Sequence, residues 1–73
     1  METDQWGRRI RAFRKLKGYT QERLAQKLGL SISVLGDIER GYRPLSKELM
    51  QQIADELQIQ ADELRPPKNK VER

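Results

Sequence analysis

Residues 18–41 read GYTQERLAQKLGLSISVLGDIERG, and this stretch decides the fold. Gly29 divides it into two segments whose apolar residues recur every three or four positions, the spacing of one face of an α-helix. The apolar residues with this spacing are Leu24, Leu28, Leu35 and Ile38. Because glycine adopts a left-handed backbone without steric cost, Gly29 ends the first of these two segments and turns the chain. The stretch therefore predicts two short helices, over 20–28 and 31–40, packed against each other.

An amphipathic helix precedes this pair. Trp6, Ile10 and Phe13 fall on one face of a helix over 4–17, and Leu16 lies close to that face. Aromatic rings at this spacing are more often core residues than stacking platforms for bases. We therefore expect Trp6 and Phe13 to pack inside the domain.

Two more helices follow the central pair. Ser46 is a good N-cap for a helix over 46–57, and a last short turn spans 61–64. The apolar residues expected to pack there are Leu49, Met50, Ile53, Leu57 and Leu64.

The composition agrees with a single small domain. The chain has 73 residues, enough for one domain, and strong helix formers dominate it. Pro66 and Pro67 end the helical pattern. We therefore predict an all-α domain of four to five helices over 1–65, followed by a flexible basic tail over 66–73.

The chain lacks the residue types that several classes of function require. The chain has no cysteine and no histidine, so the usual nucleophile–base pairs and the usual metal ligands are missing. We expect no enzyme activity, no cofactor and no metal. No apolar run approaches the roughly 20 residues that span a bilayer, so we expect no membrane partner and a cytoplasmic protein.

Charge is unevenly distributed along the chain. The net charge is +4, and residues 8–27 contain eight basic side chains against one acidic one. Residues 37–63 contain seven acidic side chains against three basic ones. The basic segment 8–27 is thus suited to contact a polyanion, although charge runs of this kind are also ordinary solvated helix faces. With the central helix pair, this asymmetry makes duplex DNA the first candidate partner.

The chain resembles the lambda-repressor/Cro-like, or XRE-type, helix-turn-helix family over roughly 10–64. The resemblance rests on residue types and spacings in four helices, namely Arg14, Lys17-Gly18, Tyr19-Thr20-Gln21, Leu24-Ala25, Leu28-Gly29, Ser31, Ile38-Glu39-Arg40-Gly41, Ile53-Ala54 and Leu57. It implies a compact domain of five helices that inserts its third helix into the major groove.

The resemblance also implies contacts to the DNA backbone. Thr20 and Gln21 stand at the start of the second helix, where free amides and the positive dipole end can hold a phosphate. The alternative is that Thr20 only caps the helix and Gln21 is solvated. Arg40 and Arg43 are further phosphate candidates, with Lys47 a weaker one, whereas other cations of the first helix are expected mostly to be solvated.

A structural role is expected for another pair. By resemblance, Arg14 and Glu39 form an internal ion pair between the first helix and the end of the third. Arg14 is therefore not counted as a DNA contact, and removal of either partner should lower stability.

The positions expected to face bases are unusual. They are Ile32, Ser33, Val34 and Asp37, and none has the bidentate side chain that recognises a purine. Ser33 can make one hydrogen bond, an apolar side chain can pack on a thymine methyl group, and Asp37 can accept from a cytosine amino group while repelling phosphates. Gly36 between them suggests a close approach of the backbone to DNA or to the second helix.

Two functions remain open at this point. The first is a dimeric transcriptional regulator, a nucleoid-associated repressor with modest direct readout. The second is a protein-interaction adaptor with weak or non-specific DNA binding, and an RNA-binding role has least support. A homodimer would use the C-terminal apolar residues Leu57, Ile59, Leu64 and Val71.

Overall fold

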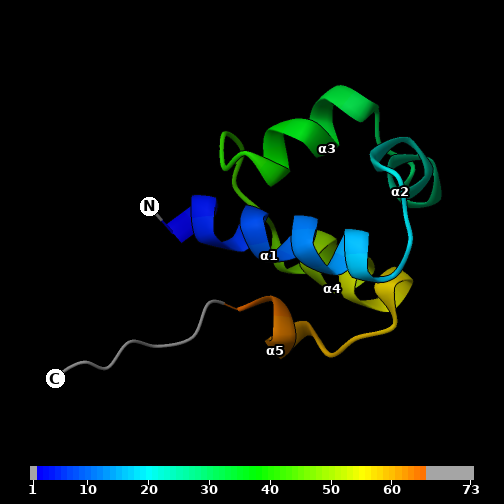
Figure 1. Ribbon diagram of the computed structural model, residues 1–73. Helices are drawn as coiled ribbons and strands as arrows, with labels where there is room; N and C mark the ends of the chain where they lie inside the picture. Colours follow the sequence, from blue (N-terminus) through cyan, green and yellow to red (C-terminus); the bar gives the residue numbers. More distant parts are fainter. Residues whose placement is uncertain (1, 66–73) are drawn as a thin grey trace, which may run out of the picture.

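The computed structural model describes residues 2–65, and this part of the chain folds into five helices (Figure 1). Their bounds are α1 Glu2–Leu16, α2 Gln21–Leu28, α3 Ile32–Glu39, α4 Lys47–Leu57 and α5 Ala61–Leu64. No strand occurs within residues 2–65, so the all-α prediction is confirmed. The first helix begins two residues earlier than expected. The predicted basic tail, 66–73, lies outside the described residues.

Hydroxyl side chains begin three of the helices. Thr20 Oγ1 accepts a hydrogen bond from Arg23 N at 3.0 Å, and Ser31 Oγ accepts one from Val34 N at 3.1 Å. Ser46 fills the same role for α4. These caps satisfy amides that have no partner inside their own helix, and they fix where α2, α3 and α4 begin.

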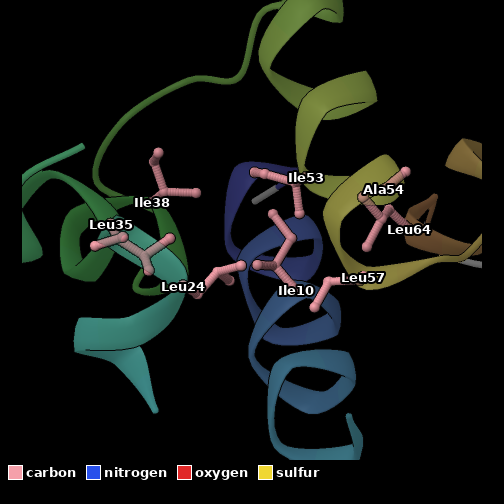
Figure 2. Packing of buried hydrophobic residues seen from close by; sticks show 9 residues of the cluster. Ile10, Leu24, Leu35, Ile38, Ile53, Ala54, Leu57 and Leu64 are labelled. Atoms are coloured by element: carbon pink, nitrogen blue, oxygen red, sulfur yellow. The ribbon is translucent and has the colours of Figure 1, made fainter. Parts of the chain in front are cut away.

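Ile10 of α1 stands at the centre of the core (Figure 2). On one side it meets apolar side chains of α2 and α3, and on the other side those of α4 and α5. The remaining core residues are Leu24, Ala25, Leu35, Ile38, Ile53, Ala54, Leu57 and Leu64. Because α1 is packed against both halves, it fixes the helix pair α2–α3 relative to the rest of the domain.

Some partly buried residues complete this core. Trp6 and Phe13 pack against it, as expected for core aromatics. Leu49 and Met50 of α4 also pack against the core as expected, and both are half-buried at its edge.

Burial corrects two predictions about apolar residues. Leu16 is predicted near the buried face of the first helix, yet 74% of its surface is exposed at the last residue of α1. Leu57 and Leu64 were candidates for a dimer surface, but they are fully buried inside the domain, and Ile59 packs against the core. Val71, the fourth candidate, lies outside the described residues.

Gly7 marks the closest approach of α1 to α3. A Cβ atom at Gly7 would lie 2.5 Å from the carbonyl oxygen of Glu39, and closer still to that of Ile38. Only a residue without a side chain therefore allows α1 to lie against the end of α3. This role cannot be predicted from the sequence, because a single glycine inside a helical pattern does not reveal which backbone lies beside it.

Candidate nucleic-acid interface

The outward face of α3 carries most of the side chains expected to face bases. Leu35 and Ile38 point into the core, so the opposite face is turned to solvent. Ile32 and Ser33 are exposed at the start of the helix, and Asp37 is partly exposed one turn further on. Val34 differs from these three residues, because it is half-buried and packs against the core.

Arg14 and Glu39 are joined by two hydrogen bonds. Arg14 Nε lies 2.7 Å from Glu39 Oε2, and Arg14 Nη2 lies 3.2 Å from Glu39 Oε1. The two side chains are only 9% and 3% exposed. Arg14 Nη1 also donates to the Tyr19 carbonyl oxygen at 2.9 Å, so the guanidinium joins α1, the α1–α2 loop and α3.

Gln21 belongs to the same network. Its Nε2 atom donates to Glu39 Oε1 at 3.1 Å, so Glu39 receives hydrogen bonds from both α1 and α2. Gln21 is half-buried, and Thr20 before it is exposed and occupied as the cap of α2. The residue that was predicted to hold a phosphate is therefore also part of the internal structure.

A polar hollow of about 380 Å³ opens beside this network. It lies where the middle of α1, the start of α2 and the end of α3 come together. Its lining consists of Arg11, Arg14, Gln21, Gly36, Glu39 and Arg40. Because three of these six residues are arginines and one is acidic, the hollow is suited to an anion. Arg11 is one of the cations of the first helix that the sequence predicts to be solvated, and only the packing of α1 against α3 brings it to the hollow.

Asp37 lies between the two cations that follow α3. Arg40 Nη1 is 3.9 Å from Asp37 Oδ1, and Arg43 Nη2 is 4.0 Å from Asp37 Oδ2. The Arg40 guanidinium also lies 5.9 Å from the centre of the exposed Tyr42 ring, within range of a cation–π contact. The acidic residue on the outward face is thus partly neutralised by neighbours on the same surface.

Lys47 is exposed at the first position of α4. It takes part in none of the contacts just described for Gln21, Asp37 and the hollow. Its assignment as a weaker phosphate contact stays a prediction.

Other kinds of site find no support within residues 2–65. No cluster of acidic side chains there is arranged to hold a metal ion. No helix in that range is long and apolar enough to cross a membrane.

The fold and the exposed α3 define a helix-turn-helix protein, a class in which the second helix of the motif is presented to nucleic acid. The model of the helix-turn-helix family HTH_3 matches residues 10–64, and the chain belongs to this family. The resemblance seen in the sequence is therefore confirmed.

Proteins that are similar to this chain in sequence or structure are named as regulators. The chain is 64% identical over 67 residues to the uncharacterized HTH-type transcriptional regulator YazB of Bacillus subtilis strain 168, and the match covers 92% of this chain and 97% of that protein. The restriction-modification controller protein C.AhdI of Aeromonas hydrophila is similar in structure, with a TM-score of 0.82, 38% identity, and coverage of 86% and 91%. The clp gene regulator ClgR of Corynebacterium glutamicum has a TM-score of 0.84 at 28% identity, with coverage of 88% and 68%. The chain is accordingly a transcriptional regulator with a DNA-binding helix-turn-helix fold.

Proposed function

We propose that this protein is a repressor that binds operator DNA as a dimer, with α3 in the major groove. The observation that supports this proposal is the position of the arginine-lined hollow directly beside the exposed face of α3. A helix that enters the major groove brings the surfaces at its two ends close to the phosphates. A cationic hollow at one end of α3 is then correctly placed for the DNA backbone.

One phosphate would occupy the hollow. Arg11 and Arg40 supply positive charge there, and the start of α2 adds the positive end of a helix dipole. Gln21 would turn its amide from Glu39 towards a phosphate oxygen. Glu39 keeps both hydrogen bonds from Arg14 during this change, so the internal ion pair is preserved.

A second contact to the DNA backbone would come from Arg43, and Lys47 would add a weaker one. In the unbound protein Arg43 is held near Asp37 at 4.0 Å, a weak pair between exposed groups. A phosphate can replace this pairing at little cost. Each such contact adds affinity that depends on salt and not on base sequence.

Base reading would be modest. Ser33 can donate to several bases, Ile32 can pack on a thymine methyl group, and Asp37 can accept from a cytosine amino group. Val34 is the weakest candidate, because it already packs against the core. Sequence-dependent DNA shape would supply the rest of the specificity.

The biological action would be to block polymerase from an operator, in the bacterial cytoplasm at the nucleoid. Two copies would bind half-sites about one helical turn apart, which is roughly 10 base pairs. Since Leu57 and Leu64 are buried within each copy, the contact between copies must use other residues.

The first test is selection from a random pool of duplex DNA at low and at near-physiological salt, followed by sequencing of the retained DNA. We expect a palindromic motif whose half-sites are about 10 base pairs apart. Retention at low salt without an enriched motif would exclude an operator-binding repressor. The adaptor function would then be favoured, with exposed Ile32 as part of its contact surface.

The second test measures how binding to the recovered motif depends on salt. Arg40→Ala and Arg43→Ala should each reduce the slope of log K against log salt by about 0.9, the value for one lost phosphate contact. Arg65→Ala is the matched control, because it removes the same charge from an exposed residue after α5. A slope that falls equally in all three variants would show an effect of net charge alone and would exclude the two specific contacts.

A further inference from the structure

The side chain of Arg40 lies folded back across Gly36. A Cβ atom at Gly36 would be 3.2 Å from Arg40 Nη1, 3.3 Å from Nη2 and 3.7 Å from Cζ. All three nearest atoms belong to this one guanidinium group. The flat group therefore lies over the bare backbone of α3, four residues before its own position.

Two other neighbours hold the same guanidinium. Asp37 lies 3.9 Å away on α3, and the ring of Tyr42 lies 5.9 Å away in the following loop. The Arg40 side chain is nevertheless 58% exposed, and it lines the polar hollow. These contacts, each weak by itself, favour one position of the Arg40 side chain while its outer surface stays open to an anion.

The presence of glycine at position 36 requires a structural explanation, because only proline is less favourable than glycine inside a helix. A close approach of α2 is not that reason, since the atoms nearest to the missing side chain belong to Arg40. A Cβ atom at this position would require the guanidinium to move outward by a few tenths of an ångström. The absence of a side chain therefore lets the guanidinium lie this close to the backbone of α3.

We propose that Gly36 is a positioning residue that presents the Arg40 guanidinium to a DNA phosphate in the hollow. This inference rests on the proposed function as a DNA-binding regulator. An arginine that is already held near its bound position loses less conformational freedom when it binds, so the same contact yields a higher affinity. Alanine at position 36 removes this advantage, because its methyl group meets the guanidinium at 3.2–3.3 Å.

The test is a double-mutant cycle of Gly36→Ala and Arg40→Ala, with binding measured on the DNA motif that the wild-type protein selects. Gly36→Ala should raise the thermal midpoint, because alanine favours the helix, and yet weaken DNA binding about threefold to tenfold. In the Arg40→Ala background the same change should alter affinity by less than about twofold. Gln52→Ala on the exposed side of α4 is the control for helix propensity, and it should leave DNA binding unchanged.

A second measurement needs no DNA. The Nε–H signal of Arg40 in ¹H–¹⁵N spectra should shift in Gly36→Ala, because the guanidinium moves relative to the Tyr42 ring. The same signal should stay in place in Gln52→Ala. An unmoved Arg40 signal in Gly36→Ala would overturn the inference, whatever the DNA measurements show.

The cycle separates the possible failures. Equal losses of affinity in both backgrounds would mean that the backbone at Gly36 meets DNA itself, and would overturn the positioning role. Unchanged binding by Gly36→Ala, with a loss in Arg40→Ala, would overturn the positioning role while leaving the DNA-binding function in place. No duplex binding by the wild-type protein would overturn both.

Discussion

Gln21 and Glu39 are joined by a hydrogen bond of 3.1 Å between Nε2 and Oε1, and that same oxygen accepts from Arg14 at 3.2 Å. One buried carboxylate therefore connects the residue proposed to hold a phosphate with the ion pair that fastens α1 to α3. A change at Glu39 affects the stability of the domain and the orientation of Gln21 together. A change at Gln21 removes only one of the hydrogen bonds that Glu39 receives.

Replacement of Glu39 should show the cost of a buried cation without its partner. We predict that Glu39→Ala lowers the free energy of unfolding by about 3 kcal/mol, because Arg14 stays buried with no opposing charge. Urea denaturation followed by circular dichroism measures this loss. Glu22→Ala removes an exposed carboxylate at the start of α2 and should cost less than about 1 kcal/mol. Similar losses in the two variants would contradict a special role for the Arg14–Glu39 pair.

Asp37 should restrain binding to arbitrary DNA. We predict that Asp37→Asn raises affinity for duplexes of random sequence several-fold, because it removes a negative charge between Arg40 and Arg43. The salt bridges that are lost are long and exposed, so stability should change by less than about 1 kcal/mol. Fluorescence anisotropy with a random duplex tests this prediction. Weaker binding by the variant would mean that Asp37 serves mainly to organise the arginines.

Gly7 should tolerate no side chain. We predict that Gly7→Ala lowers the free energy of unfolding by about 1–3 kcal/mol, although alanine favours a helix, because its methyl group would overlap the carbonyl groups at the end of α3. Gly36→Ala is the comparison, since its new methyl group meets only a flexible side chain. A thermal midpoint that rises in both variants would contradict the close approach of α1 to α3.

Tyr19 should make stability depend on alkaline pH. Its hydroxyl donates to Glu56 Oε2 at 2.7 Å. This hydrogen bond, with desolvation and the charge of Glu56, raises the pKa of Tyr19 above its ordinary value of 10.0, and nearby Arg23 opposes the shift. Because the pKa is higher in the folded state, the stabilisation is complete below pH 10 and is lost as the pH rises through the folded-state pKa.

The measurement is the thermal midpoint as a function of pH. Tyr19→Phe should have a lower midpoint at neutral pH and a shallower decline above pH 10 than the wild-type protein. Tyr42→Phe, which changes an exposed ring in the loop after α3, should decline as steeply as the wild type. An equal decline in Tyr19→Phe would rule out the Tyr19–Glu56 contact as its source.

Local signals made most of the fold predictable. Thr20, Ser31 and Ser46 are hydroxyl residues before apolar helical patterns, and each one caps the helix that follows. Leu35 and Ile38 pack inward as their spacing indicates. Such features depend on neighbours within a few positions, so sequence alone reveals them.

Contacts between distant residues were harder to predict. Leu16 continues an apolar pattern but is exposed, because no helix covers the end of α1. Leu57 and Leu64 were candidates both for the core and for a dimer surface, and the packing of α5 on α4 places them in the core. Gly36 suggested a close approach of DNA or of α2, and within the domain the atoms nearest to its missing side chain are those of Arg40.

Periodicity and residue types at short spacing were enough to predict an all-α domain of four to five helices, the N-caps of α2, α3 and α4, and the family. Only the tertiary structure decided which side chains share a site. It brought Arg11 beside Gln21 and Arg40, joined Gln21 to Glu39, and placed Asp37 between two arginines. The physical reason is that α1 crosses the end of α3 at Gly7, and such a crossing depends on how whole helix surfaces fit together.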